Sequence, residues 1–191
     1  DATSKQMRDL ADISDEFSFG EIRVTHEQNL VLPHVQNSKI YDLWCKLINL
    51  NLTTPNIGLI RDTICCQGMD YCALATARSI PISQKISNHF KTYQEQKKLG
   101  DLKIKISGCI NACGHHHVGN IGILGLDRNG QEFYQITLGG SARENASIGQ
   151  IVGPSFSEKD LMGAIEKILQ TYEKNRINEN DDFLTVFKRI G

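Results

Sequence analysis

Residues 107–114 read Ser107-Gly108-Cys109-Ile110-Asn111-Ala112-Cys113-Gly114, so two cysteines stand with three residues between them. A second pair lies upstream, where Cys66 and Cys72 have five residues between them. A cubane iron–sulfur cluster needs four thiolates, one for each iron. The two spaced pairs therefore predict a cluster site that is assembled from two separate loops.

Zinc and disulfide bonds are the two alternative uses for four cysteines. Structural zinc sites usually place about two to four residues inside each pair, and the first pair here is wider. Disulfide frameworks belong to small, cysteine-dense secreted domains. This chain has 6 cysteines in 191 residues and no signal-like segment at its start. Spacing and composition therefore favour a cluster.

The two remaining cysteines fall outside this pattern. Cys65 lies beside Cys66 and is an alternative ligand, which would leave six residues before Cys72. The residues alone leave that choice open. Cys45 follows Trp44 on an apolar helical stripe, so we expect it to be a buried core thiol.

Composition and charge exclude several classes of function. The length suits one substantial domain or two small ones. Hydrophobic residues make up 40% of the chain and the formal net charge is −1, which gives no basis for binding nucleic acid or an acidic membrane. No apolar run approaches a membrane span. The cysteine usage and the missing secretion signal predict a cytoplasmic protein.

The first region predicts a helix–strand–strand–helix unit. Apolar spacing indicates a helix over residues 4–19, a strand over 21–25 and a partner strand over 29–32. Ser38 is expected to cap a second helix. The apolar stripe of that helix holds Ile40, Leu43, Trp44, Leu47 and Ile48. A boundary with the second region falls near residues 53–56.

Strands that alternate with helices predict an α/β domain in the second region. The expected elements begin with a strand over 57–64, a helix over 72–79 that Pro81 interrupts or restarts, a helix over 83–98 and a strand over 102–106. They continue with a hairpin of strands 120–124 and 132–138 joined by a turn at 127–130, a helix that begins behind Ser157, and a short helix over 183–187.

The strands over 57–64 and 102–106 deliver Cys66 and Cys109, so each cysteine pair is expected where a strand ends. A helix starting at Cys72 would point its positive end at an anionic cluster. Gly68, Gly108 and Gly114 are expected to let peptide N–H groups approach the cluster sulfides.

The cysteine spacing and its flanks resemble those of the sulfite and nitrite reductases that carry siroheme coupled to a 4Fe–4S cluster. The matching strings are GMDYCALA (68–75), ARSIP (77–81), GHHH (114–117), GNIGILG (119–125) and YQITLGG (134–140). They are most similar to the C-terminal part of the hemoprotein (beta) subunits of bacterial assimilatory sulfite reductases. The resemblance covers nearly the whole chain.

The resemblance implies a chain of mixed α+β and α/β class. Half of a ferredoxin-like platform over residues 1–52 is followed by an α/β domain over 53–191 that binds siroheme and the 4Fe–4S cluster. The implied cluster ligands are Cys66, Cys72, Cys109 and Cys113. Cys113 is also implied to bridge the cluster to the siroheme iron, which makes it the catalytic residue of the electron path.

Siroheme is a polycarboxylate, so basic and amide side chains are expected to line its site. Arg23, Gln28 and Asn29 match a family string, and Asn111 lies between two implied cluster ligands. His115 begins a run of three histidines, of which one or two are expected to donate to the carboxylates. The alternatives are a surface charge for Arg23 and a solvated loop for the histidines.

The implied activity is the six-electron reduction of sulfite to sulfide. A nitrite reductase that forms ammonia, a cluster-only electron-transfer module, and a binding domain stabilised by zinc or disulfides are the alternatives. The implied partners are the N-terminal half of the same protein, a flavoprotein or ferredoxin as electron donor, and sulfite or nitrite. The basic residues that bind substrate are expected upstream, so the isolated chain is expected to be inactive.

Overall fold

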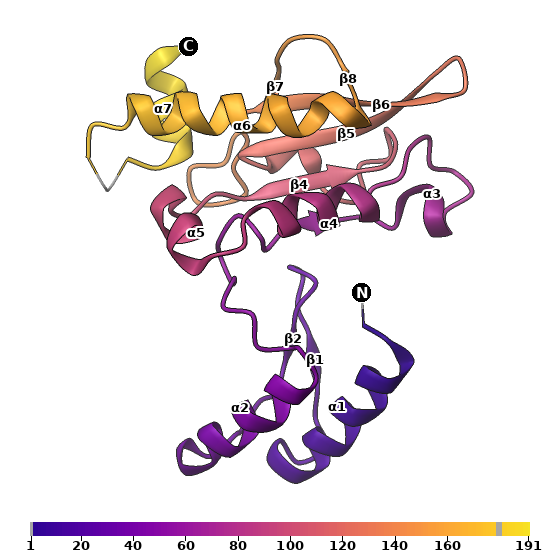
Figure 1. Cartoon of the computed structure of the whole chain (residues 1–191), viewed down its shortest axis with the longest axis vertical. Helices are drawn as coiled ribbons and strands as arrows, with labels where there is room; N and C mark the ends of the chain where they lie inside the picture. Colours follow the sequence, from indigo (N-terminus) through magenta and orange to yellow (C-terminus); the bar gives the residue numbers. More distant parts are fainter. Residues whose placement is uncertain (1, 179–180) are drawn as a thin grey trace. The chain divides into compact units, whose positions relative to one another are not determined.

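The computed structural model describes residues 2–178 and 181–191 of the chain. They fall into two compact units, Asp1–Pro55 and Asn56–Gly191 (Figure 1). No helix in this described part is both long enough and apolar enough to cross a membrane.

The first unit holds two helices and a short antiparallel ribbon. Its elements are α1 (Ser4–Phe17), β1 (Arg23–Val24), β2 (Leu30–Val31), the 3-10 turn η1 (Asn37–Lys39) and α2 (Ile40–Asn49). Ile13 and Phe17 of α1 form its core together with Leu43 of α2. The expected helix–strand–strand–helix order is therefore confirmed, with strands shorter than expected.

Local sequence signals set both ends of α1. The N–H of Gln6 donates to Thr3 Oγ1 (3.2 Å), and the N–H of Thr3 donates to Gln6 Oε1 (2.8 Å), which completes a capping box. The helix ends at Phe17 rather than at residue 19. Gly20, at φ +73°, donates its N–H back to Ser14 O (2.9 Å) and turns the chain away.

α2 departs from expectation at its start and along its face. The expectation that Ser38 caps the helix is wrong, because Ser38 is already wound into η1 and the N-cap position falls on Lys39. Leu43 is buried and Leu47 half-buried, but Ile40, Trp44 and Ile48 are exposed. Cys45 is half-buried, not a buried core thiol. The reason is the small facing surface, since the cluster that α2 joins contains two buried side chains of α1, Ile13 and Phe17.

The second unit is built on a mixed sheet with strand order β3-β4-β5-β6-β7, and β8 also pairs with β6 (Figure 1). The strands are β3 (Ile64–Cys65), β4 (Ile104–Ser107), β5 (Ile121–Arg128), β6 (Gln131–Leu138), β7 (Gln150–Ile151) and β8 (Phe156–Ser157). β3, β4 and β5 pair in parallel, whereas β6 pairs antiparallel with β5, β7 and β8. All residues of β4 are buried, as expected for a parallel strand inside a sheet that is covered on both faces.

Helices complete the core of this unit. They are α3 (Gly68–Tyr71), α4 (Ile80–His89), α5 (Tyr93–Leu99), the 3-10 turn η2 (His116–Val118), α6 (Glu158–Asn175) and α7 (Phe183–Ile190). Fully or almost fully buried side chains join sheet and helices: Ile82, Ile86, Ile104, Ile106, Ile121, Ile123, Ile136, Leu161 and Ile165. The mixed α/β class is confirmed, as are the strand over 102–106, the hairpin, the helix behind Ser157 and the terminal helix. At the hairpin turn, Asn129 and Gly130 adopt φ +56° and +78°, as a tight two-residue turn requires.

The expected strand over 57–64 is wrong for most of its length. The N–H of Leu59 donates to Asn56 O and the N–H of Asp62 donates to Leu59 O, each at 2.9 Å. Gly58, between them, has φ +78°. Because these successive turns use N–H and C=O groups that a strand would need for pairing, the chain joins the sheet only at Ile64.

The expected helix over 72–79 is also wrong. Cys72 is the C-cap of the one-turn helix α3, so no helix start at Cys72 points toward the cysteine loops. The N–H groups of Thr76 and Ala77 instead donate to Gly108 O in the other cysteine loop, at 2.9 and 3.0 Å. Pro81 lies in the first turn of α4, where its missing N–H costs no hydrogen bond.

The expected helix over 83–98 is split into α4 and α5. Thr92 and Glu95 form a capping box at the start of α5, which restarts the helix in a new direction. The short strands β7 and β8 were not expected from the sequence. Both pair with β6, and their residues show no clear alternation of apolar and polar side chains.

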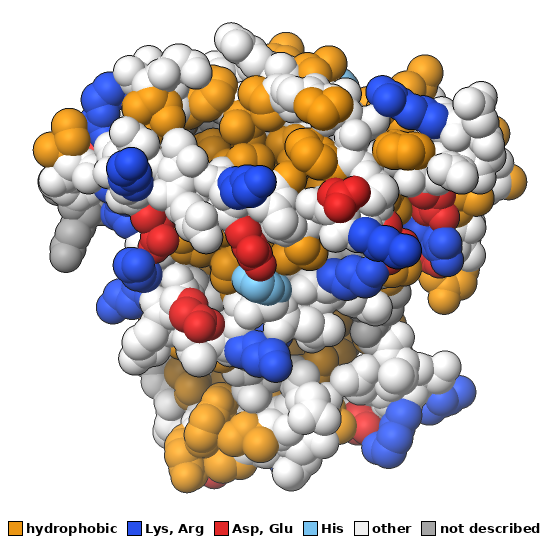
Figure 2. Space-filling view, turned by 45° about the horizontal axis from the view of Figure 1, so that its top comes forward, with side chains coloured by type: hydrophobic (Ala, Val, Ile, Leu, Met, Phe, Trp, Pro, Cys, Tyr) orange, Lys and Arg blue, Asp and Glu red, His pale blue; other side chains and the backbone are white. Residues whose placement is uncertain are grey.

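Charged side chains of both signs are interspersed on the face that Figure 2 shows. Ion pairs join α6 to the two helices before it: Lys85–Glu158, His89–Glu166 and Lys98–Glu173. This face therefore carries a mixed field rather than the single-sign field that attracts nucleic acids.

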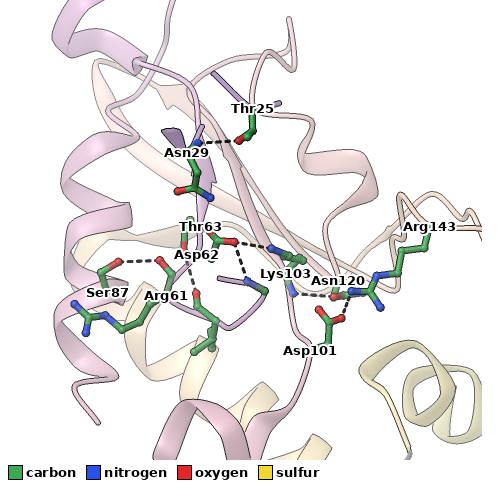
Figure 3. A network of polar contacts seen from close by, with 12 residues as sticks. Thr25, Asn29, Arg61, Asp62, Thr63, Ser87, Asp101, Lys103, Asn120 and Arg143 are labelled. Atoms are coloured by element: carbon green, nitrogen blue, oxygen red, sulfur yellow. Dashed lines mark hydrogen bonds and ion pairs between the residues drawn. The ribbon is translucent and has the colours of Figure 1, made fainter. Parts of the chain in front are cut away.

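A buried ion pair ties the turns before β3 to the start of β4 (Figure 3). Asp62 Oδ2 lies 2.8 Å from Lys103 Nζ, and the two side chains are 5% and 14% exposed. The N–H of Gly58 also donates to Asp62 Oδ2 (3.0 Å). The N–H of Lys103 donates to Asn120 Oδ1 (2.8 Å), so the pair is connected to the residue before β5.

Lys103→Met should destabilise the second unit strongly, because it removes the cation beside a buried carboxylate. We expect the free energy of unfolding, measured by urea denaturation at pH 7, to fall by about 3–5 kcal/mol. The matched control Lys98→Met breaks the exposed pair with Glu173 and should cost less than about 1 kcal/mol. Equal losses in the two variants would contradict this account.

Candidate functional site

The paired cysteines follow two neighbouring parallel strands. β3 and β4 pair in parallel, with Cys65 opposite Ile106. Parallel neighbours end at the same edge of a sheet, so the loops that follow them emerge side by side. Cys66 comes directly after β3 and Cys109 shortly after β4. The expectation that each pair sits where a strand ends is therefore confirmed.

Close backbone packing locks the two loops together. A Cβ atom on Gly108 would lie 2.6 Å from Ala77 O and 2.8 Å from Gly68 Cα. A Cβ atom on Gly114 would collide with the carbonyl oxygen of Ile106 and lie 3.2 Å from the backbone nitrogen of Cys66. Both positions therefore require glycine, because the loops meet backbone to backbone there.

The Gly108 backbone connects the two loops by hydrogen bonds. Its N–H donates to Cys66 Sγ (3.1 Å). Its carbonyl oxygen accepts from the N–H of Thr76 (2.9 Å), the N–H of Ala77 (3.0 Å) and Thr76 Oγ1 (3.0 Å). An N–H group aimed at a cysteine sulfur stabilises negative charge on that sulfur, as at iron–sulfur sites.

The four paired cysteines differ in exposure. Cys109 is buried, Cys66 and Cys72 are half-buried, and Cys113 is exposed. Exposed apolar side chains accompany them in the same loops: Met69, Tyr71, Leu74 and Ile110. Cys113 is therefore the most exposed of the four paired cysteines.

Cys65 and Cys66 point to different surroundings. Cys65 packs against the hydrophobic core, and burial raises the pKa of its thiol above the ordinary value. Cys66 instead receives the Gly108 N–H and lies 3.5 Å from Ser79 Oγ. This difference supports Cys66 rather than Cys65 as the member of the first pair.

The residues present fit an iron–sulfur cluster in kind, and the two loops that carry them lie together. Four thiols on two adjoining loops and an N–H directed at one of the sulfurs are parts that such a cluster needs. All six cysteines are free thiols. Across residues 2–178 and 181–191, however, no three His, Cys, Asp or Glu side chains are gathered into a metal-binding group. The structure thus brings the two loops together without drawing the four sulfurs into ligand geometry.

The three histidines after Cys113 do not act as one group. His115 is exposed at φ +54°, and His117 is also exposed. His116 is buried, and its Nδ1 has no hydrogen-bond partner within the described residues. Burial first, and the charge of His117 second, lower the pKa of His116 to about 4. His116 is therefore neutral at pH 7, which leaves His115 and His117 as the accessible donors.

The other expected cofactor residues are exposed or half-buried, and they lie on strand β1, on the connection that follows it and on the second cysteine loop. Asn111 is exposed between Cys109 and Cys113. Arg23, in the first unit, is exposed, and its Nε donates to Glu21 Oε1 (2.6 Å). Gln28 is exposed at φ +63°, and the N–H of Asn29 donates to Thr25 Oγ1 (3.0 Å), as Figure 3 shows for Thr25 and Asn29. Nothing in these contacts assigns a cofactor to any of them.

Sequence reasoning missed the residues between the first cysteine pair and α4. The N–H of Arg78 donates to Glu132 Oε2 (2.6 Å), and its guanidinium lies 2.7 Å from Glu132 Oε1. Burial opposes ionisation of Glu132, but hydrogen bonds and charge from Arg78 outweigh it and lower the pKa of that carboxyl. Tyr134 OH donates to Arg78 O (3.0 Å). The string Ala77-Arg78-Ser79 was the available signal for these contacts of Arg78 with Glu132 and Tyr134.

Comparison with protein families gives the class of the chain. Residues 58–183 match the family described as the nitrite and sulphite reductase 4Fe-4S domain. Residues 1–50 match the nitrite/sulfite reductase ferredoxin-like half domain. The chain belongs to the nitrite and sulphite reductase 4Fe-4S domain family, which confirms the family, the ferredoxin-like half and the 4Fe–4S cofactor that the cysteine spacing predicted.

Individual relatives include reductases of both substrates. The chain is 28% identical to the chloroplastic ferredoxin–nitrite reductase of Spinacia oleracea, over 86% of this chain and 28% of that protein. It is 26% identical to the sulfite reductase [NADPH] hemoprotein beta-component of Bacillus licheniformis, over 90% of this chain and 30% of that protein. The chain thus spans about a third or less of the curated relatives described here.

Solved structures show the same fold. The NirA protein of Mycobacterium tuberculosis superimposes with a TM-score of 0.82 at 23% identity, over 97% of this chain and 35% of that one. Dissimilatory sulfite reductase I superimposes with a TM-score of 0.80 at 12% identity, over 100% of this chain and 64% of that one.

Gly114→Ala should destabilise the cysteine loops, because the new methyl group would collide with the Ile106 carbonyl. We expect the free energy of unfolding to fall by about 1–3 kcal/mol or more, measured in urea. Gly163→Ala is the matched control, since a Cβ there meets open space on α6 and should stabilise by about 0.5–1 kcal/mol. Similar effects at the two glycines would show that the loops do not meet as described.

Proposed function

We propose that this chain is the cluster-binding and siroheme-binding part of an assimilatory sulfite reductase hemoprotein. The whole enzyme carries out the six-electron reduction of sulfite to sulfide in the cytoplasm. The observation that carries this proposal is the pair of cysteine loops at the ends of β3 and β4, with the Gly108 N–H directed at Cys66 Sγ. Membership of the reductase family supports it.

The four paired cysteines serve as the cluster ligands in this proposal. Cys66 and Cys72 come from the loop after β3, and Cys109 and Cys113 come from the loop after β4. A bound 4Fe–4S cluster supplies one-electron transfer at low potential. In this proposal Cys113, the most exposed of the four, would also hold the siroheme.

Basic and amide groups of this chain hold the carboxylates of siroheme. Asn111 and His115 lie on the loop of the second cysteine pair, and Arg23, Gln28 and Asn29 lie on the ribbon of the first unit. The planar guanidinium of Arg23 can bind a carboxylate through two donors. The groups that bind the substrate and protonate it are proposed to come from other regions of the enzyme.

Nitrite is the second candidate substrate. Ferredoxin–nitrite reductases of Spinacia oleracea and Synechococcus elongatus are 28% and 27% identical to this chain, as close as the sulfite reductase relatives. The electron donor is accordingly proposed to be either a ferredoxin or a flavoprotein. Both substrates would use the same cysteine loops.

The first unit is proposed to join a symmetric partner half. Its ribbon exposes Val24, Leu30 and Val31, and its second helix exposes Ile40 and Trp44. Apolar groups gathered on one small unit favour association with another surface. A ferredoxin-like half domain requires such a counterpart, which supports a partner of the same kind.

Replacing any of Cys66, Cys72, Cys109 or Cys113 by serine should remove the cluster from the parent enzyme. Each substitution deletes one of the thiolates that the cluster needs. Cys45→Ser and Cys65→Ser are the controls and should keep full iron and acid-labile sulfide, measured on protein purified without oxygen. Full cluster content in Cys109→Ser would disprove the ligand set, and loss in Cys65→Ser would exchange Cys65 for Cys66. Stoichiometric zinc without iron uptake would favour a zinc-binding domain.

The 191-residue chain alone should not reduce sulfite or nitrite with an artificial electron donor, because we place the substrate-binding groups elsewhere. Adding the separately expressed remainder of the parent protein should restore part of the activity. The intact parent, assayed on both anions, distinguishes sulfite reductase from nitrite reductase. Near-parent turnover by the chain alone would show that the active site has been misplaced.

A further inference from the structure

Ser79 has an unusual position at the start of α4. It occupies the N-cap of the helix, yet its side chain makes no capping hydrogen bond. A serine at this position ordinarily caps the helix and contributes about 1 kcal/mol. Its hydroxyl instead donates to Cys66 O (2.6 Å) and lies 3.5 Å from Cys66 Sγ. Ser79 is fully buried, with 0% of its surface exposed, so water does not compete for this hydroxyl.

A backbone N–H donor reaches the same sulfur from the opposite loop. The Gly108 N–H donates to Cys66 Sγ at 3.1 Å. Thr76 Oγ1 lies 3.0 Å from Gly108 O and 3.1 Å from Gly125 O, which fixes Gly108 against β5. Residues 76–79 thus fix both polar neighbours of this sulfur: the Ser79 hydroxyl belongs to this segment, and Thr76 holds the Gly108 backbone.

We propose that Ser79 is a positioning residue of the site formed by the two cysteine loops. Its hydroxyl orients Cys66 and, together with the Gly108 N–H, sets the reduction potential of the bound cluster. The inference rests on the proposed function, because it takes Cys66 as a cluster ligand. The Ser79 hydroxyl faces two acceptors of one residue, the carbonyl oxygen and the sulfur of Cys66.

The expected direction follows from charge. Reduction adds one negative charge to the cluster and its thiolates, and hydrogen bonds to a ligand sulfur stabilise that added charge. Removing a donor therefore favours the oxidised state and makes the midpoint potential more negative. Loss of the Ser79 hydroxyl should lower the ratio of reduced to oxidised cluster on the order of tenfold at a fixed potential, which corresponds to about 59 mV for one electron.

Ser83 supplies a matched control on the same helix. It lies one turn beyond Ser79, and its hydroxyl hydrogen-bonds with Cys65, the neighbouring cysteine. Ser79→Ala and Ser83→Ala therefore delete the same group from the same helix, beside Cys66 and beside Cys65 respectively. A general weakening of α4 would affect both variants, whereas the proposed role affects Ser79→Ala alone.

The test uses the 191-residue chain, reconstituted with iron and sulfide without oxygen. Iron and acid-labile sulfide are measured first, and the midpoint potential is then measured by titration followed through the electron paramagnetic resonance signal of the reduced cluster. Ser79→Ala should keep its cluster and shift to a more negative potential, while Ser83→Ala keeps the parent potential. Thr76→Val should shift in the same direction by less, and Thr76→Ser, which retains the hydroxyl, should match the parent.

Each outcome decides between the two proposals. A parent chain that takes up no 4Fe–4S cluster overturns the proposed function and this inference with it. If the unsubstituted 191-residue chain binds the cluster and Ser79→Ala has the same midpoint potential, this inference alone is overturned. A shift in Ser83→Ala without one in Ser79→Ala also overturns it and makes Cys65 the ligand. Where Ser79→Ala fails to fold, equal potentials in Thr76→Val and Thr76→Ser overturn the inference.

Discussion

The backbone of Gly108 is the constraint on which the cysteine site depends. Its N–H donates to Cys66 Sγ, and its carbonyl oxygen accepts from two N–H groups and one hydroxyl of residues 76 and 77. These bonds join segments that lie more than thirty residues apart along the chain. No side chain can be added at Gly108 without striking Ala77 O or Gly68 Cα. The loops therefore approach closely because glycine, which has no side chain, occupies the contact positions Gly68 and Gly108.

This arrangement has a structural cost in the segment between Cys72 and α4. Residues 73–79 give up helical hydrogen bonds to each other and make long-range ones instead, to Gly108, Gly125 and Glu132. Ser79 likewise gives up capping α4 and turns its hydroxyl to Cys66. The hydrogen bonds that position Cys66 thus replace the local helical bonds of this segment. Departures of this kind from sequence-based expectation are typical of functional sites.

The two units contribute differently to function. The second unit has a continuous core around β4, so it supports the cysteine loops on a rigid sheet. The first unit has a small cluster of buried side chains, Ile13, Phe17 and Leu43, and exposes apolar groups on its ribbon. Small units of this kind gain stability from an additional surface. The cysteine loops therefore have a well-packed support within the second unit, whereas the first unit leaves much of its apolar surface exposed.

The cofactor class and the family were recognisable in the sequence through the spacing of the cysteines and the resemblance of their flanks. The elements with strong periodicity, α1, β4, the hairpin of β5 and β6, and α6, were predictable from apolar spacing and turn residues, which act over short distances along the chain. Tertiary structure alone decided the course of residues 57–63 and 73–79, the break between α4 and α5, and the different surroundings of Cys65 and Cys66. It also separated His116, buried and neutral, from the accessible His115 and His117. In each case a backbone or side-chain group found its partner, or its burial, through contacts that sequence proximity does not encode.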